Sequence, residues 1–201
     1  MSTIIHTRVY PEPHIDRREI LRYAGVRDGG EELYPLVDGL LSELLPKLTY
    51  RVCYSVFPIT LQGASVDLGF AKVNSHSLSR CLDGCDRIVL FAATVGLAVD
   101  RATLRYGAIS ESRALLTEAI GNERIEALCD TFCRDMRERY GTDGYTLCPR
   151  FSPGYGDLPI ELQRDIFSTL MPSSKIGLTL NSSLLMSPAK SVTAVVGMRR
   201  G

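Results

Sequence analysis

Residues 111–140, ESRALLTEAIGNERIEALCDTFCRDMRERY, hold the clearest periodic pattern in the chain. Five apolar side chains recur there at i, i+3, i+4, i+7 and i+11, the spacing of one helical face: Ile125, Leu128, Cys129, Phe132 and Met136. This pattern predicts a long amphipathic helix, with Gly121 as the place where it could be broken. A second decisive stretch, IVLFAA at 88–93, is a continuous apolar run typical of a strand buried on both faces.

Weaker signals place the other elements around these two segments. Asp16 can cap a helix, and Pro35 falls in the first turn of another, where proline is tolerated. The segment 141–159 is rich in Gly, Pro and Tyr and is predicted to be a long loop. Spacing and turn signals predict helices over 16–23, 31–48, 77–82 and 160–170, a helical region opening at Gly96, and strands over 50–59, 65–70, 176–185 and 191–198.

This order of elements lacks a regular βαβ alternation and predicts an α+β fold with a largely antiparallel sheet. No internal repeat or domain-splitting linker is visible, so we expect a single domain over 1–201, with 1–15 as an extended N-terminal arm.

Composition limits the classes of partner. The 201 residues are 45% hydrophobic and 23% charged, as in an ordinary globular domain. Twenty-three basic and 23 acidic side chains cancel, so no extended field favours nucleic acid or an anionic membrane. No apolar run reaches the ~18 residues that a membrane span requires, and residues 1–6 do not resemble a signal peptide. We therefore expect a cytoplasmic protein that contacts neither nucleic acid nor membrane.

The six cysteines are expected to be reduced thiols, most of them small core residues. Two Cys-x-x-x-Cys pairs, Cys81/Cys85 and Cys129/Cys133, could supply four thiolates to zinc, but structural zinc sites favour tighter spacings and Cys129 lies on an apolar helix face. No metal ligands are therefore assigned. The segment FAATVG at 91–96 has one glycine instead of the spaced set of a dinucleotide loop, and common serine-nucleophile motifs are missing.

The segment 148–159, CPRFSPGYGDLP, is the strongest candidate for a binding site. Arg150 beside a tight Pro-Gly turn offers a rigid guanidinium for a carboxylate, and Tyr155 offers an aromatic face for a cation or a planar ring. Such a loop suits a zwitterionic ligand. The alternative is an ordinary proline-rich surface turn with a solvated arginine.

Several of these segments together resemble the activation domain of cobalamin-dependent methionine synthase. Arg150, Gly154 and Tyr155 stand at the spacing of that family's Arg-x-x-x-Gly-Tyr motif, which marks its S-adenosylmethionine site. The segments Glu126-Ala127-Leu128, FAATVG at 91–96 and PAKSVTAV at 188–195 are also similar to family segments. The family pattern differs after Tyr155, where Gly-Asp-Leu-Pro follows, at Val192-Thr193, where the family has an aromatic pair, and at Gly144, where it has a glutamate.

The resemblance implies a twisted, largely antiparallel sheet with flanking helices in a C-shaped molecule. It implies that Arg150 binds the carboxylate of S-adenosylmethionine and that backbone groups of Pro153 and Gly154 line the ligand. Tyr155 and Glu126 would face the reacting centre and the corrinoid, as the predicted catalytic residues. The family's closing strand also touches the ligand, which adds two more contacts: Val192 and Thr193.

The resemblance further implies reductive methylation of cob(II)alamin, with S-adenosylmethionine as methyl donor. No segment resembles a homocysteine or folate barrel, and no histidine belongs to an Asp-x-His-x-x-Gly motif. We therefore expect a free-standing reactivation subunit, not catalytic alone. Its partners would be a corrinoid-bearing methionine synthase that lacks its own activation domain and supplies the cobalamin, and a flavodoxin-like or ferredoxin-like electron donor. Two alternatives stay open: a non-catalytic module that docks on a corrinoid protein or senses S-adenosylmethionine, and a scaffold that keeps only the core.

Overall fold

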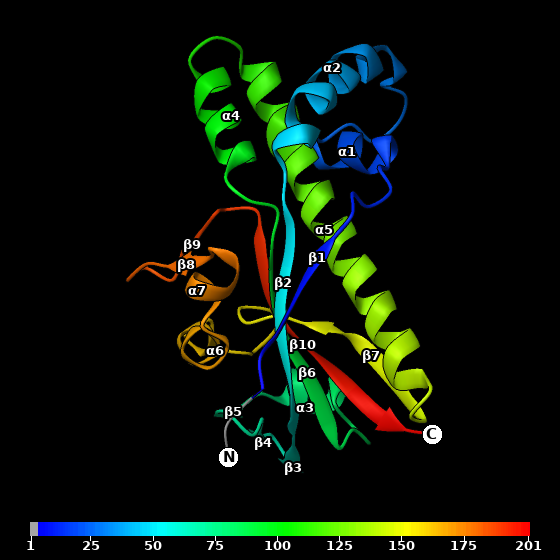
Figure 1. Cartoon of the computed structure of the whole chain (residues 1–201), viewed down its shortest axis with the longest axis vertical. Helices are drawn as coiled ribbons and strands as arrows, with labels where there is room; N and C mark the ends of the chain where they lie inside the picture. Colours follow the sequence, from blue (N-terminus) through cyan, green and yellow to red (C-terminus); the bar gives the residue numbers. More distant parts are fainter. Residues whose placement is uncertain (1–3) are drawn as a thin grey trace.

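A five-stranded antiparallel sheet of order β1-β2-β6-β10-β7 runs through the centre of the protein (Figure 1). The structure is a computed structural model that describes residues 4–201. The strands are β1 (His6–Tyr10), β2 (Tyr50–Pro58), β6 (Arg87–Thr94), β7 (Tyr145–Phe151) and β10 (Ser191–Arg200).

The middle strand β6 is buried on both faces, as its uninterrupted apolar run predicted. Its side chains alternate between two cores. Val89, Phe91 and Ala93 join the core under the long helix α5, whereas Ile88, Leu90 and Ala92 join the core on the opposite face. We call these the α5 face and the α6 face of the sheet.

The helix α5 (Glu111–Gly141) crosses the α5 face as one continuous element (Figure 1). The expectation of a break at Gly121 was therefore wrong. Gly121 marks a close approach instead, because a Cβ atom there would lie 2.6 Å from Val99 Cγ1 and 2.9 Å from Lys190 Cγ. The glycine lets two other segments touch the helix, and the helical backbone continues through it.

Beyond one end of the sheet, the first half of α5 packs against shorter helices through a third apolar cluster. Asp16 caps the first of these as predicted, accepting hydrogen bonds from the Arg18 and Glu19 amides at 2.9 and 3.2 Å. These elements are α1 (Arg17–Tyr23), the 3-10 turns η1 (Glu31–Leu33) and η2 (Leu45–Lys47), α2 (Tyr34–Leu44) and α4 (Ala98–Gly107).

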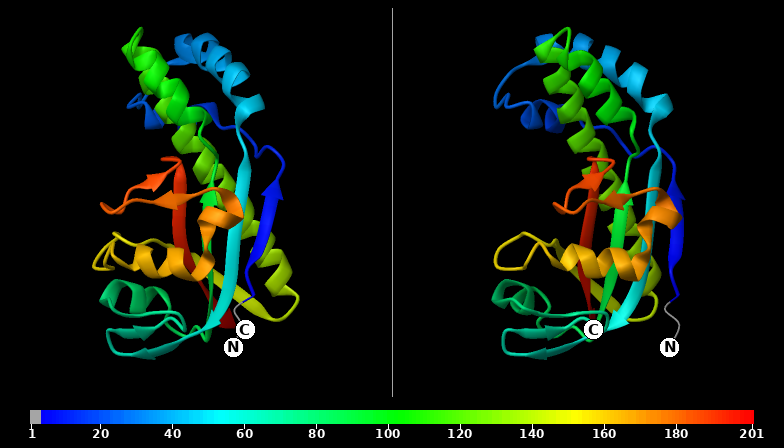
Figure 2. Two further views of the ribbon diagram at one scale, coloured as in Figure 1. Left: turned by 60° about the vertical axis from the view of Figure 1, so that its left-hand side comes forward. Right: turned by 90° about the vertical axis from the view of Figure 1, so that its left-hand side faces the viewer.

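The α6 face carries the remaining elements. They are α3 (His76–Cys81), α6 (Leu162–Leu170), α7 (Pro172–Ile176), a small sheet of β3 (Thr60–Gln62), β4 (Ser65–Asp67) and β5 (Lys72–Asn74), and the pair β8 (Thr179–Leu180) and β9 (Met186–Ser187). Figure 2 shows the helices at one end and the small sheet at the other projecting to the same side, which gives the expected C-shaped outline.

Three sequence predictions need correction. The predicted loop 141–159 contains the strand β7, which pairs with β10 despite its proline. The predicted strand 176–185 is reduced to the two residues of β8, and Pro172 begins α7, where its missing N–H costs nothing. Within the predicted arm 1–15, residues 6–10 form the edge strand β1, while residues 1–3 lie outside the described residues.

Among residues 4–201, no helix is long and apolar enough to cross a membrane.

Candidate functional site

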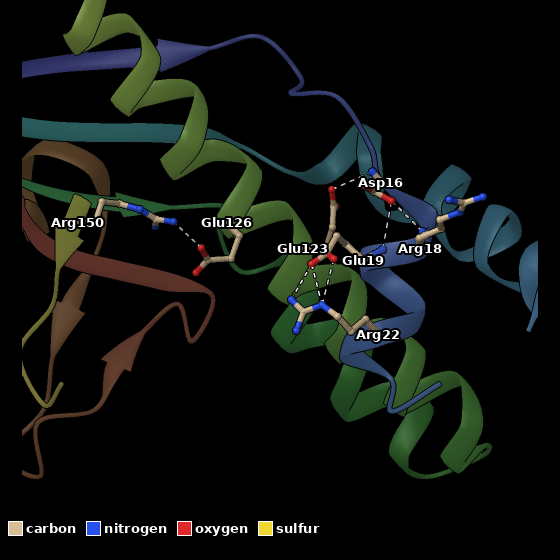
Figure 3. A network of polar contacts seen from close by, with 7 residues as sticks. All are labelled: Asp16, Arg18, Glu19, Arg22, Glu123, Glu126 and Arg150. Carbon is tan, nitrogen blue, oxygen red and sulfur yellow. Dashed lines mark hydrogen bonds and ion pairs between the residues drawn. The ribbon is translucent and has the colours of Figure 1, made fainter. Parts of the chain in front are cut away.

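Arg150 of β7 reaches across to α5 and forms an ion pair there (Figure 3). Its Nη2 donates to Glu126 Oε2 at 2.7 Å and to Asp130 Oδ1 at 3.1 Å. Glu126 and Asp130 are four residues apart, so one turn of the helix presents both carboxylates to the same guanidinium. The structure thus brings together two of the predicted site residues, 24 positions apart in sequence.

An irregularity in β7 decides which face of the sheet receives Arg150. Leu147 pairs with Met198 of β10 and Arg150 pairs with Val196, so two residues of β7 lie opposite the single residue Gly197. The extra residue shifts the alternation of side chains. Leu147 and Arg150 therefore both point to the α5 face, although three positions separate them.

The Arg150 guanidinium is mostly covered, with 24% of the side chain exposed, whereas Glu126 is 40% and Asp130 67% exposed. Burial alone would lower the pKa of Arg150, but Cys129 and the Glu126 carboxylate outweigh it and the pKa moves upward. Arg150 thus remains charged at any physiological pH. Its Nε and Nη1 groups donate to no partner within residues 4–201, so each can still give a single hydrogen bond to another anion.

The loop after β7 is tied down by its own backbone and by Asp157. The Gly154 amide donates to the Leu158 carbonyl at 2.9 Å, so this predicted ligand contact is already used inside the loop. Asp157 accepts hydrogen bonds from Ser75 Oγ and from the His76 and Ser77 amides at the start of α3, which hold the pKa of its carboxyl well below the usual range. The loop is therefore fixed to the α6 face of the sheet.

Tyr155 projects from this loop with 70% of its surface exposed. Its ring stands edge-on to the buried ring of Phe151, with 5.4 Å between centroids. Pro153 is buried, and Gly154 has a φ of +86°, which favours glycine. The loop thus presents one aromatic side chain to solvent on a rigid base.

The strand β10 places its two predicted contact residues on opposite faces of the sheet. Val192 packs on the α5 face, with Arg150 and Glu126, while Thr193 alternates to the α6 face. β7 pairs with β10 only from Val195 onward, so residues 191–194 have a strand partner on the β6 side alone. This open edge of β10 lies at the end of β7 where Arg150 stands.

A pocket of about 330 Å³ adjoins the two carboxylates on the side away from β7. Its other wall is the N-terminal segment with α1, which sequence reasoning did not connect to the site. Five of its eleven lining residues are acidic; the lining comprises Pro13, His14, Asp16, Glu19, Tyr23, Glu123, Glu126, Ala127, Asp130, Thr131 and Arg134.

Glu123 and Arg124 fasten the N-terminal wall of this pocket to α5. The Arg124 side chain is fully buried, pairs with Glu123 at 2.5 Å, and donates to the carbonyls of Pro13 and His14. Glu123 also accepts from the Asp16 amide at 3.1 Å (Figure 3). No local sequence signal distinguishes this buried pair from solvated helix charges, whereas Asp130 could have been found from its position one turn after Glu126.

The two Cys-x-x-x-Cys pairs lie in different cores. Cys129 and Cys133 belong to the core of the α5 face, and burial raises the pKa of Cys133 to about 11. Cys81 and Cys85 pack on the core of the α6 face. No group of three or more His, Cys, Asp or Glu side chains suited to a metal ion occurs in the described part of the chain.

The curved antiparallel sheet with one long crossing helix defines an activation-domain-like fold. The crystal structure of the MetH reactivation domain bound to AdoHcy matches this chain with a TM-score of 0.73 and 16% sequence identity, over 97% of this chain and 78% of that chain. No protein-family model and no curated sequence matches. The structural likeness confirms the predicted α+β fold with its antiparallel sheet and flanking helices.

Proposed function

We propose that the chain binds S-adenosylmethionine at Arg150 and serves as a reactivation subunit for a cobalamin-dependent methionine synthase. One observation carries the binding proposal. Arg150 stands beside an open strand edge, where its Nη2 holds two carboxylates and its Nε and Nη1 have no partner among residues 4–201. The solved reactivation domain of the same fold is described as bound to AdoHcy, the demethylated form of this ligand.

The charges of this site fit those of S-adenosylmethionine. The ligand's carboxylate would accept a single charge-assisted hydrogen bond from Nη1 or Nε of Arg150, since Nη2 is already bonded to Glu126 and Asp130. Its ammonium and sulfonium groups are cations, and Glu126 and Asp130 supply partly exposed negative charge at the same place. Arg150 would then hold the ligand and the helix carboxylates together.

The neighbouring backbone and aromatic groups complete the proposed site. Val192 on the open edge of β10 would contact the ligand from the α5 face, whereas the Thr193 side chain is buried on the opposite face, so only its backbone would reach the ligand. The carbonyls of Pro153 and Gly154 would contribute acceptors, since the Gly154 amide is already bonded to Leu158. The exposed Tyr155 ring would meet the corrinoid of the second protein.

The chain's task in this reaction is positioning. Cobalamin, carried by a separate synthase, would supply the methyl-accepting metal centre, and a flavodoxin-like or ferredoxin-like protein would supply the electron. No side chain of this protein needs to act as a nucleophile. Arg150 and Glu126 would orient the methyl donor, and Tyr155 would hold the incoming partner at the right face.

Calorimetric titration with S-adenosylmethionine tests the binding step. We expect the wild-type chain to bind and Arg150→Ala to lose at least about tenfold in affinity, because a charge-assisted contact contributes about 1.5–3 kcal/mol. Arg137→Ala is the matched control, an exposed arginine on α5, and should bind like the wild type. Equal affinities of Arg150→Ala and the wild type would refute this site.

A turnover assay tests the larger role. The purified chain is added to an oxidised cobalamin-dependent synthase that lacks an activation domain, with S-adenosylmethionine and a reduced flavodoxin. Recovery of methionine formation with wild type, but not with Arg150→Ala, is the expected result. Binding of S-adenosylmethionine without recovery would assign the chain to the class of non-catalytic binding modules.

A further inference from the structure

Cys81, Cys85 and Cys148 gather near one another on the α6 face, apart from Cys53 in the core of that face and from the two cysteines buried in α5. Cys85 lies in the turn between α3 and β6, and Cys148 lies on β7. Their sulfur atoms are 3.5 Å apart, and both side chains are partly exposed. Cys81 is close by, with its thiol 3.8 Å from the Pro149 carbonyl. The sequence suggested core packing for most cysteines, and this trio has a different environment.

The contact between Cys85 and Cys148 depends on Gly197 of β10. A Cβ atom at this glycine would lie 2.7 Å from Cys85 Sγ and 3.3 Å from Cys148 Cβ. Gly197 is also the single residue that faces the extra residue of β7. The missing side chain and the strand irregularity together leave room for two sulfur atoms side by side.

We propose that Cys85 and Cys148 form a redox modification site that closes to an intramolecular disulfide. The sulfur atoms need to approach by about 1.5 Å, since a disulfide bond is about 2.05 Å long. This inference stands independently of the proposed ligand and partners.

The oxidation balances with a peroxide as two-electron oxidant. One thiol gives a sulfenic acid and one water as the O–O bond breaks. The second sulfur then attacks the sulfenic sulfur, forms the S–S bond and releases the second water. Burial and the contact with Cys148 raise the pKa of Cys85 to about 12, so its reduced form is a protonated thiol at neutral pH.

The disulfide would join the turn 82–86 to the irregular part of β7, two residues before Arg150. This part of β7 decides which face Arg150 occupies, so the oxidised form would fix the strand in the geometry that directs Arg150 to Glu126. The bond would also close a loop between positions 63 residues apart, which restricts the unfolded chain strongly.

Oxidation of the folded, full chain with hydrogen peroxide tests this site. Free thiols are then alkylated, and the protein is mapped by mass spectrometry without reduction. We expect a crosslinked peptide containing Cys85 and Cys148, a loss of two hydrogen atoms from the intact mass, and reversal by dithiothreitol. From the loop length we expect a rise in melting temperature of about 8–16 °C.

Three variants separate this pair from general thiol oxidation. Cys85→Ser and Cys148→Ser should each abolish the crosslink and the rise in melting temperature, while the matched control Cys81→Ser should keep both. A wild-type chain that yields no Cys85–Cys148 peptide, or yields it only after denaturation in urea, overturns the proposal. Crosslinking of Cys148 to Cys81 instead overturns it as well.

Discussion

The buried ion pair of Glu123 and Arg124 is predicted to hold the N-terminal segment against α5. Replacing Arg124 by methionine keeps most of the apolar volume and removes the charge. The Glu123 side chain, only 5% exposed, would then keep one described partner, the Asp16 amide at 3.1 Å. The carbonyls of Pro13 and His14 would lose the guanidinium as donor.

The loss of stability expected for Arg124→Met follows from leaving the buried Glu123 carboxylate without its charged partner. Removing one partner of a buried ion pair costs about 3–5 kcal/mol of folding free energy. The carbonyls of Pro13 and His14 also lose their hydrogen-bond donor, which adds to the cost. In a chain of this length, each kcal/mol shifts the melting temperature by about 2–4 °C. We therefore expect Arg124→Met to melt about 6–20 °C below wild type.

Urea unfolding and calorimetry measure the loss, and hydrogen exchange locates it. Amides of residues 13–16 should exchange faster in Arg124→Met, because this segment loses its anchor. Arg137→Met, an exposed arginine on the same helix, should stay within about 0.5 kcal/mol of wild type.

A double-variant cycle separates the stranded charge from the lost packing. Glu123→Gln/Arg124→Met has no buried carboxylate left, so it should be less destabilised than the sum of the single changes. A loss below about 1 kcal/mol for Arg124→Met, or strict additivity in the cycle, would contradict the assignment of this pair as an anchor.

Two further changes test the packing and the electrostatics of the helical end. Gly121→Ala should destabilise the protein by about 1 kcal/mol in thermal melts, since overlap with Val99 exceeds the gain in helix propensity; equal or higher stability would show that the neighbours move freely. Hydrogen bonds from Tyr106 and Arg105 lower the pKa of Glu43 from 4.5 to about 2. The folded state therefore binds fewer protons than the unfolded state between these values, so stability falls as pH drops through that window. Glu43→Gln should flatten this part of the curve in urea titrations at several pH values, and an unchanged slope would contradict it.

Periodicity predicted the parts of the fold whose side chains face a core. The helix α5 and the strand β6 have nearly the predicted bounds, because their apolar residues repeat with the period of each element. The capped start of α1 was likewise visible in Asp16. These features depend on local sequence, so a single sequence is enough to predict them.

The strand β7 was missed because its stability comes from a distant segment. Its sequence, YTLCPRF, contains a proline and lies between glycine-rich turns, which are loop signals. Pairing with β10 supplies the hydrogen bonds, and the edge position tolerates Pro149. Tertiary pairing of this kind leaves little trace in the strand itself.

The candidate site shows the same contrast between features that local sequence predicts and features that depend on distant segments. Arg150 was named from its own loop and Glu126 through the resemblance, and their contact is present, but nothing local in either segment predicts that they meet. The N-terminal wall of the acidic pocket could not be predicted, since Glu123 and Arg124 look like surface charges. Burial of charged residues becomes visible only when their partners from other segments are in place.

The irregularity between β7 and β10 connects these findings. In a regular strand, residues three apart point to opposite faces, and Arg150 would then face away from Leu147 and from the carboxylates of α5. One extra residue opposite Gly197 reverses that direction and at the same time leaves the space in which Cys85 and Cys148 touch. The direction of Arg150 and the proximity of the two thiols therefore have a single structural cause, so a change at Gly197 should disturb both.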